Sequence, residues 1–247
     1  MQYQFGSGNL FGLVLSGGIL VPRKFAALQD VSVDFSFNLK ELYGQNQFPL
    51  TIARGQGKIA LKAKAANIHG ATMNDIFFGG TNASGKTESV IGEVATISAG
   101  AATAANGATY KDDEGVIFVA TGVPLLRVSS APAVGQYSVN ASGVYAFNVG
   151  DNGKQVLLDY TYTVAGSGNT TTINNLLSGT TPTFIASLPI SKKQDDGVLK
   201  TFYMRFNNCF SEKLSIATKI EDFTIPEFDF KAAADVSGVI GTVSSAE

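Results

Sequence analysis

Cysteine and histidine are almost absent from this chain of 247 residues, which contains one of each, Cys209 and His69. One cysteine cannot form a disulfide within the chain, and the familiar zinc sites draw on several cysteine and histidine ligands. Cys209 lies in a strand-like stretch, so we expect a buried, inert thiol and not a nucleophile, which would need a nearby base. The sequence therefore predicts no metal site and no catalytic residue, and we expect a protein that is not an enzyme.

Charged residues are scarce as well, because they make up 15% of the chain, whereas about 25% is typical of soluble domains. The 18 basic and 20 acidic residues leave a net charge of −2. No basic cluster offers the lysines and arginines that bind nucleic-acid phosphates. A surface with so little charge is tolerable where neighbouring subunits cover it. The composition thus fits a component of an assembly and, equally, a β protein with an ordinary polar surface.

Long hydrophobic runs are also missing. The apolar stretch at residues 10–21 contains three glycines and is shorter than the ~20 residues that span a bilayer. No basic residue precedes it, as a signal peptide would require. We therefore expect an N-terminal arm or first hairpin over about residues 1–22, no membrane partner and no export. The N-x-[ST] matches at Asn82, Asn140 and Asn169 are accordingly not expected to carry glycans.

Two stretches of alternating residues dominate the first third of the chain. Residues 30–42 alternate apolar with polar side chains, which is the pattern of a strand with one buried face. Residues 58–66 alternate likewise, with lysines at positions 58, 62 and 64. If the two strands pair antiparallel, Asp30 and Asp34 can lie opposite lysines, and each such pair is worth about 0.2 to 1 kcal/mol. The loop at residues 43–49 follows the first strand.

One short helix is expected after these strands. Asn67 can cap a helix that runs to about Phe78, with Ile76 and Phe77 on one side. Gly70 lowers the helix propensity of this segment.

A phosphate-binding motif follows the helix. Residues 80–87 match the pattern G-x-x-x-x-G-K-[ST] at its fixed positions Gly80, Gly85, Lys86 and Thr87. In a nucleotide-binding protein the backbone amides would cradle phosphates, with Lys86 on the terminal phosphates and Thr87 on magnesium. Such a loop needs a buried strand before it and a helix after it, whereas residues 87–98 alternate as a strand. We therefore expect no cofactor, and nucleotide binding stays an alternative.

The remainder of the chain favours β-structure. Residues 99–107 are small and predict a flexible loop outside the core. Short strands are expected between residues 115 and 163, including a hairpin at 136–147. Longer strands are expected at residues 184–190, 198–210 and 215–230, where Pro189 and Pro226 are restricted to strand ends or edges.

Several segments carry a family resemblance. They are LQDVSVDF at residues 28–35, KELYG at 40–44, ARG at 53–55, NDIFFG at 74–79 and EFDFKAAAD at 227–235. Together they resemble the major tail proteins, the tail-tube subunits of long-tailed bacteriophages. The resemblance implies a mainly β fold, namely a tail-tube-type β-sandwich or barrel with one short flanking helix at about 67–78. Because both ends are similar, residues 1–110 and 166–247 are expected to form this domain, with residues 111–165 as a β-rich insertion or an extension of the same sandwich.

Proteins of this family assemble into hexameric rings that stack into a tube, through which DNA passes without specific binding. The resemblance implies a structural virion protein in the phage tail, made in the cytoplasm of the host bacterium. Its expected partners are other copies of itself and the tape-measure, tail-terminator and distal tail proteins. A lumen that conducts DNA should be neutral or weakly acidic, so that phosphates slide. The polar face with Asp30, Ser32, Asp34 and Ser36 suits such a lining, although the nearby lysines oppose it.

The resemblance also implies a contact between rings. In this family an extended loop between early strands and a terminal arm join neighbouring rings, and residues 43–54 match the position of that loop. Tyrosine, phenylalanine and arginine are favoured in interface cores, so the candidate contact residues are Tyr43, Gln47, Phe48 and Arg54. A well-packed ordinary loop is the structural alternative. Two other functions stay open beside the tube subunit, namely a different β-rich phage structural protein, such as a head-decoration or connector protein, and a nucleotide-binding protein.

Overall fold

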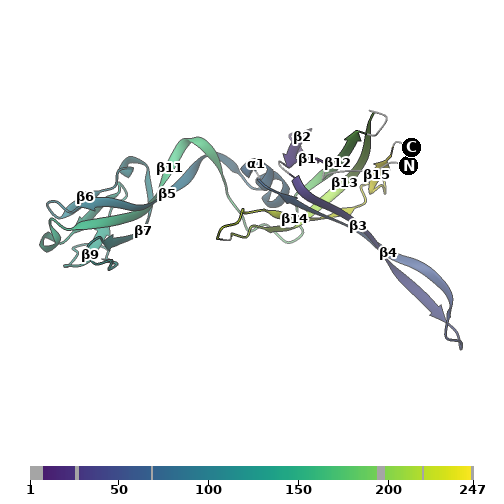
Figure 1. Cartoon of the computed structure of the whole chain (residues 1–247), viewed down its shortest axis with the longest axis horizontal. Helices are drawn as coiled ribbons and strands as arrows, with labels where there is room; N and C mark the ends of the chain where they lie inside the picture. Colours follow the sequence, from purple (N-terminus) through teal and green to yellow (C-terminus); the bar gives the residue numbers. More distant parts are fainter. Residues whose placement is uncertain (1–7, 26–27, 68, 194–197, 219, 246–247) are drawn as a thin grey trace. The chain divides into compact units, whose positions relative to one another are not determined.

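Antiparallel β-strands make up most of the protein (Figure 1), so the prediction of a mainly β fold is confirmed. The structure is a computed structural model, and it describes residues 8–25, 28–67, 69–193, 198–218 and 220–245. The chain divides into two units. Unit 1 is built from residues 1–82 and 171–247, and unit 2 from residues 83–170.

This division differs from the boundaries at residues 110 and 166 that the sequence suggested. Strand β5 (Asn82–Thr96) is hydrogen-bonded to β11 (Gln155–Thr171) in a three-stranded sheet. Because strand pairing ties these two segments together, residues 83–110 belong with residues 111–165.

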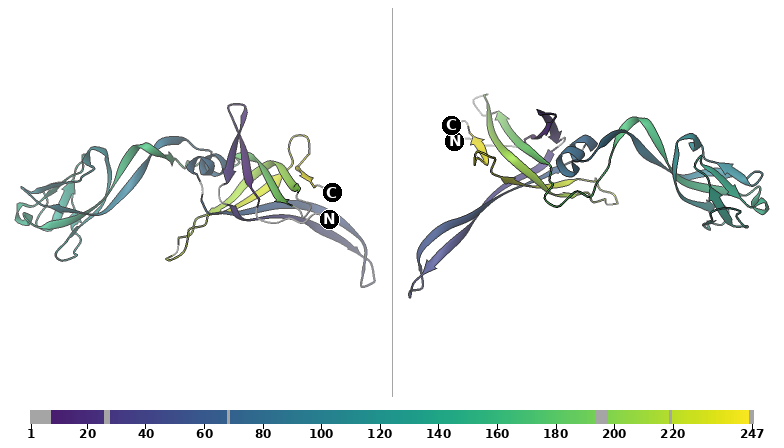
Figure 2. Two further views of the ribbon diagram at one scale, coloured as in Figure 1. Left: turned by 45° about the horizontal axis from the view of Figure 1, so that its top comes forward. Right: turned by 180° about the vertical axis from the view of Figure 1, so that it is seen from behind.

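Unit 1 contains one eight-stranded sheet, ordered β2-β1-β12-β13-β14-β4-β3 (Figure 2). The long strand β13 pairs with β12 along one edge, and its other edge is shared by β14 and the short strand β15. The continuous strand predicted at residues 215–230 is wrong, because β13 ends at Ser215, β14 begins at Glu227 and the described residues between them lie outside the strands. The bounds are β1 Leu10–Ser16, β2 Ile19–Phe25, β3 Leu28–Tyr43, β4 Pro49–Ala65, β12 Thr183–Lys193, β13 Leu199–Ser215, β14 Glu227–Ala233 and β15 Gly241–Ser244.

A short helical segment packs against this sheet. It consists of α1 (Gly70–Met73) and the π-helical turn η1 (Asn74–Phe78), and it ends at Gly79, which adopts the left-handed conformation that suits glycine at helix ends. The predicted start was wrong: His69 holds the N-cap position, and no side chain caps the first turn. Ile68, one residue earlier, lies outside the described residues.

The core of unit 1 is rich in phenylalanine. The Phe77 ring of η1 lies 5.7 Å from the rings of Phe228 and Phe230 on β14, and Phe25 meets Phe228 edge-on at 5.2 Å. Such edge-to-face pairs add about 0.5–1.5 kcal/mol to the burial of the rings. Cys209 is fully buried beside them, and burial raises the pKa of its thiol to about 12, so the prediction of a buried thiol is confirmed.

Unit 2 consists of two sheets around a core of its own, in which Tyr145 and Tyr160 are fully buried. The hairpin predicted at residues 136–147 is confirmed by the pairing of β9 with β10. Residues 99–107 are not the expected loop outside the core, because Ala102 and Ala104 are buried there. The sheets are β6-β10-β9-β8 and β5-β11-β7. The remaining bounds are β6 Ala101–Thr103, η2 Gly107–Thr109, β7 Tyr110–Phe118, β8 Leu126–Arg127, β9 Gln136–Val139, β10 Val144–Phe147 and η3 Val149–Asp151.

Candidate assembly surface

The hairpin formed by β3 and β4 runs far beyond the sheet to which it belongs (Figure 1). On its other side from β3, strand β4 is paired with β14 over residues 59–64 of β4. Beyond that point the two strands pair with each other up to Tyr43 and Pro49, and no other strand of the described residues pairs with them. We call residues 35–58 the distal hairpin and residues 43–49 its tip.

One face of the distal hairpin continues the core-facing side of the sheet. Val33 pairs with Leu61, Phe35 with Ile59 and Phe37 with Gly57, and paired residues point to the same side. Leu61 is 2% exposed in the core, whereas Phe35, Phe37 and Leu39 are 51%, 46% and 60% exposed. The face that is buried at the base of the hairpin therefore becomes a solvent-exposed apolar row, Phe35, Phe37 and Leu39, further along the same strand.

The tip of the hairpin carries no charge, and it combines the polar residues Gln45, Asn46 and Gln47 with the aromatic residues Tyr43 and Phe48. No charged residue occurs between Leu42 and Ala53, and Phe48 is 80% exposed. The hydroxyl of Tyr43 donates a hydrogen bond to the carboxylate of Glu41, which raises the pKa of Tyr43. Gln47 is also exposed. Tyr43, Gln47 and Phe48 thus all lie exposed at the projecting end of the hairpin, and their role as contact residues stays a prediction.

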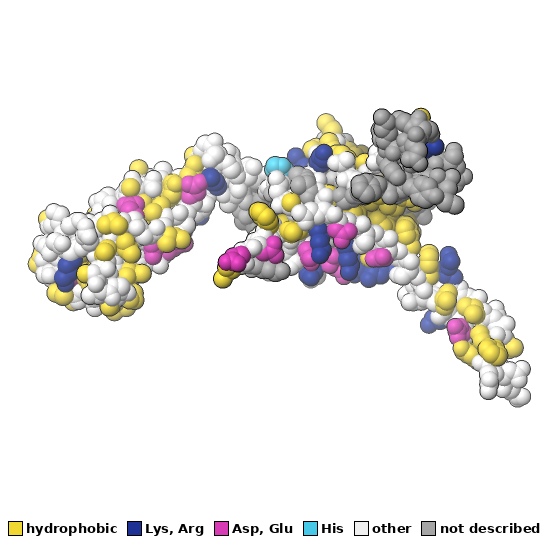
Figure 3. Space-filling model, in the orientation of Figure 1, with side chains coloured by type: hydrophobic (Ala, Val, Ile, Leu, Met, Phe, Trp, Pro, Cys, Tyr) yellow, Lys and Arg dark blue, Asp and Glu magenta, His cyan; other side chains and the backbone are white. Residues whose placement is uncertain are grey.

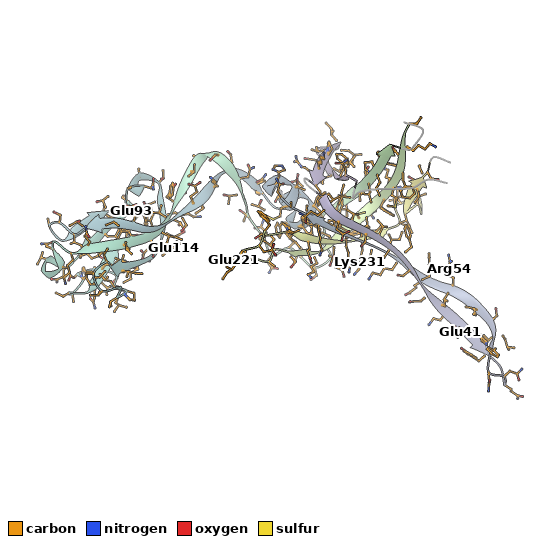
Figure 4. The ribbon with its side chains drawn as sticks, viewed as in Figure 1. Glu41, Arg54, Glu93, Glu114, Glu221 and Lys231 are labelled. Atoms are coloured by element: carbon orange, nitrogen blue, oxygen red, sulfur yellow. The ribbon has the colours of Figure 1, made fainter. Side chains whose placement is uncertain are left out.

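Arg54, the fourth predicted contact residue, lies further down the hairpin (Figure 4). It pairs with Leu39 in the register of the two strands, and its guanidinium carbon lies 4.0 Å from the ring centroid of Phe37. Arg54 therefore lies beside the apolar row and not at the tip.

The opposite face of β3 carries Asp30, Ser32, Asp34 and Ser36, the four residues predicted to line a lumen. All four are exposed. Asp30 lies opposite Lys64, which confirms one of the two expected charge pairs, but Asp34 lies opposite Ala60 and not a lysine. Figure 3 shows acidic and basic side chains mixed on this part of unit 1.

Charges of both signs continue across the same face onto β14 and β13. Lys64 forms an ion pair with Glu227 at 2.9 Å, and Lys231 forms one with Glu212. Each lysine holds the pKa of its carboxylate partner below the usual range. The face formed by β3, β4, β14 and β13 therefore mixes both signs of charge: its acidic residues include Asp30, Asp34, Glu212, Glu227 and Asp229, and its basic residues include Lys40, Lys58, Lys62, Lys64, Lys213 and Lys231.

The residues of the phosphate-binding motif do not form a phosphate-binding loop. From Asn82 onward they belong to β5, an extended strand, and a strand rather than a helix follows Gly80. Lys86 forms an ion pair with Glu88, and the Thr87 hydroxyl accepts a hydrogen bond from Lys111 at 3.0 Å. Backbone amides of a strand point alternately to its two sides, so they do not converge on a phosphate as amides at a helix N-terminus do.

Comparisons with known proteins give no family assignment, because no protein-family model and no curated protein sequence matches the chain. In the described part of the chain, no helix is both long and apolar enough to cross a membrane. Among the same residues, no group of three or more histidine, cysteine, aspartate and glutamate side chains could hold a metal ion.

Sequence reasoning missed the exposed apolar row. The sequence did contain a signal, because the alternation of residues 30–42 is longer than most strands. Neighbouring strands cover only part of so long a strand, so the apolar residues of the remaining part are exposed. The sequence does not indicate at which residue of β4 the pairing with β14 ends.

Proposed function

We propose that this protein is the subunit of a bacteriophage tail tube, a structural virion protein that binds copies of itself in stacked rings. The observation that carries this proposal is the apolar row of the distal hairpin, which continues the core face of the sheet into solvent. The resemblance to tail-tube proteins at residues 28–35, 40–44, 53–55, 74–79 and 227–235 supports the same assignment, since it implies an inter-ring contact at this hairpin.

Burial of the apolar row by a partner would be favourable in free energy. Burying a phenylalanine or leucine side chain stabilises a protein by about 1.5–3 kcal/mol. Large exposed apolar patches on otherwise folded proteins mark interaction sites. Phe35, Phe37 and Leu39 lie on a strand, which holds them in a fixed row and lowers the entropy cost of ordering them on binding. A second copy of the chain is the partner that the proposed assembly supplies.

The polar face is suited to the lumen of such a tube. On this face acidic and basic residues lie side by side and several are paired, so it offers no run of one charge that would bind or strongly repel a phosphate backbone sliding past. In this proposal DNA passes over Asp30, Ser32, Asp34 and Ser36 and over the lysines and carboxylates beside them. The tape-measure, tail-terminator and distal tail proteins are the further partners of the assembled tube in the phage tail.

Electron microscopy of the purified chain over a range of concentrations tests the proposal. Rings or hollow tubes are expected for the wild type. The double variant Phe37→Ser, Leu39→Ser should lose them while its monomer stays folded, because both side chains are exposed. The matched control is Leu126→Ser, Val134→Ser in unit 2, where two side chains of similar exposure are removed, and it should still assemble.

The outcomes separate the alternatives. Tubes that form equally well with both double variants would show that the apolar row is not the contact. A head-decoration or connector protein would associate with capsid or portal components and form no tubes of its own, so single particles at every concentration, with and without a tail initiation complex, would favour that class.

A further inference from the structure

Strands β5 and β11 extend beyond the core of unit 2 as a ribbon of two strands (Figure 1). Strand β7 is paired with β11 only up to Tyr162, which lies opposite Tyr110. From Thr163 onward, β11 has no strand partner other than β5 in the described part of the chain. We call residues 82–87 of β5 and 163–171 of β11 the ribbon.

The ribbon has almost no apolar packing. Val164 is its one large apolar side chain, and none of these described residues belongs to the core of either unit. A pair of strands in water is marginally stable on its own, and it normally needs further strands or a helix packed against it. The ribbon is therefore the least supported part of β5 and β11.

The two strands also bend within the ribbon. The carbonyl oxygen of Val164 lies 3.2 Å from the position that a Cβ of Gly85 would take, and the hydroxyl of Thr170 donates to the Gly85 carbonyl at 2.9 Å. Six residues of a straight strand cover about 20 Å, so β11 curves around Gly85 instead of running past it. Gly85 and Gly168 have φ values of +101° and +76°, which residues with a Cβ rarely adopt. The backbone can therefore change direction at these two glycines.

Hydrogen bonds mark both ends of the ribbon. At the end that leads into unit 1, the backbone amide of Thr172 donates to the carbonyl of Thr81 at 3.2 Å. At the end that leads into the core of unit 2, the hydroxyl of Tyr162 donates to the Glu88 carboxylate at 2.6 Å, and Glu88 forms an ion pair with Lys86. These contacts hold the two strands together on either side of the bend.

We propose that the ribbon is a joint, at which the core of unit 2 takes up different directions relative to unit 1 while each unit keeps its own fold. Hinges are short segments whose backbone angles absorb a change in direction, and Gly85 and Gly168 are the residues that do so here. This inference goes beyond the proposed function and does not depend on tube formation. It also gives Gly85 of the phosphate-binding motif a role, because this glycine permits the bend.

Pulsed electron paramagnetic resonance between pairs of spin labels tests the inference in the full chain. Labels are attached to Lys62→Cys, in a strand of unit 1 that is paired on both sides, and to Ile91→Cys, an exposed position of unit 2 beyond the ribbon. The native Cys209 is fully buried and inaccessible to the label. Labelled chains are diluted with unlabelled chains, so that only distances within one chain are measured. We expect the Lys62–Ile91 distance distribution to be at least twice as wide as those of two control pairs.

Each control pair stays on one side of the ribbon. Lys62→Cys is combined with Thr81→Cys in unit 1, and Ile91→Cys with Val149→Cys in unit 2, all at exposed positions. A Lys62–Ile91 distribution as narrow as both controls would overturn the inference, because the ribbon would then be rigid. An equally wide distribution for either control pair would also overturn it, because the motion would then lie within that unit and not in the ribbon.

Discussion

The guanidinium carbon of Arg54 lies 4.0 Å from the centroid of the Phe37 ring, and both side chains belong to the exposed face of the distal hairpin. Arg54 thereby covers one ring of the apolar row while the subunit is free. Cation–π contacts at exposed sites are worth about 0.5–1 kcal/mol. The contact also fixes the side chain of Phe37 on a strand pair that has no other neighbour in the sheet.

Replacing Arg54 by Ala should loosen the distal hairpin. A loss of about 0.5–1 kcal/mol corresponds to a roughly two- to fivefold increase in local opening. Amide hydrogen exchange of residues 37–42 should therefore accelerate by that factor, while exchange in β12 and β13 stays unchanged. Lys40→Ala is the matched control, because Lys40 lies on the opposite face of the same strand pair. Equal exchange rates in both variants and the wild type would contradict the role of the contact.

The alternation of residues 30–42 and 58–66 is enough to predict β3, β4 and the face that each residue occupies. It does not fix the register. Asp30 lies opposite Lys64 as expected, but the same register places Asp34 opposite Ala60, because alternation specifies the side of a residue and not its partner.

Whether a small residue is buried is difficult to predict from the sequence. Ala102 and Ala104 looked too small for a core position, yet they are buried in unit 2, where large rings such as Tyr145 and Tyr160 fill the core. Burial of an alanine depends on the size of its neighbours across the core, and these lie about 40–60 residues later in the chain.

Shortening the hairpin should block assembly without unfolding the subunit. Residues 44–49 are replaced by Asn-Gly, which suits a two-residue hairpin turn. The tip contributes no residue to the core of unit 1, so circular dichroism and the thermal unfolding temperature should stay close to wild type while tubes disappear.

A mixing experiment sharpens this prediction. The shortened chain lacks a tip but keeps the rest of unit 1, so under the proposed function it should join a growing tube and stop it. Added to wild type as a minor fraction, it should shorten the tubes seen by electron microscopy as its proportion rises. Normal tubes from the shortened chain alone would show that the tip is not the stacking element.

Lys86 should be irrelevant to nucleotides, because its motif lies in β5 and its ammonium is paired with Glu88. Isothermal titration with millimolar ATP and magnesium should detect no binding to the wild type. Lys86→Ala should change stability by no more than about 1 kcal/mol, as expected for an exposed ion pair. Saturable ATP binding that disappears in Lys86→Ala would instead revive the nucleotide-binding alternative.

Asp235 should make the attachment of β15 sensitive to acid. Its Oδ1 accepts hydrogen bonds from the backbone amides of Ser237 and Val239, at 2.9 and 3.0 Å, and its Oδ2 accepts one from Asn207 Nδ2 at 2.9 Å. The Ser237 hydroxyl and these donors lower the pKa of Asp235 from 3.8 to about 2. A carboxylate with a depressed pKa stabilises the folded state above its unfolded pKa, and this stabilisation is lost as the pH falls through about 2.

Amide exchange in β15 should therefore be faster in Asp235→Asn than in wild type at pH 7, and the difference should shrink between about pH 4 and pH 2. The control Asp34→Asn removes an exposed carboxylate from another edge of the same sheet and should leave amide exchange in β15 unchanged. If the difference between Asp235→Asn and wild type persisted unchanged at pH 2, the charge of Asp235 would not be what holds β15 in place.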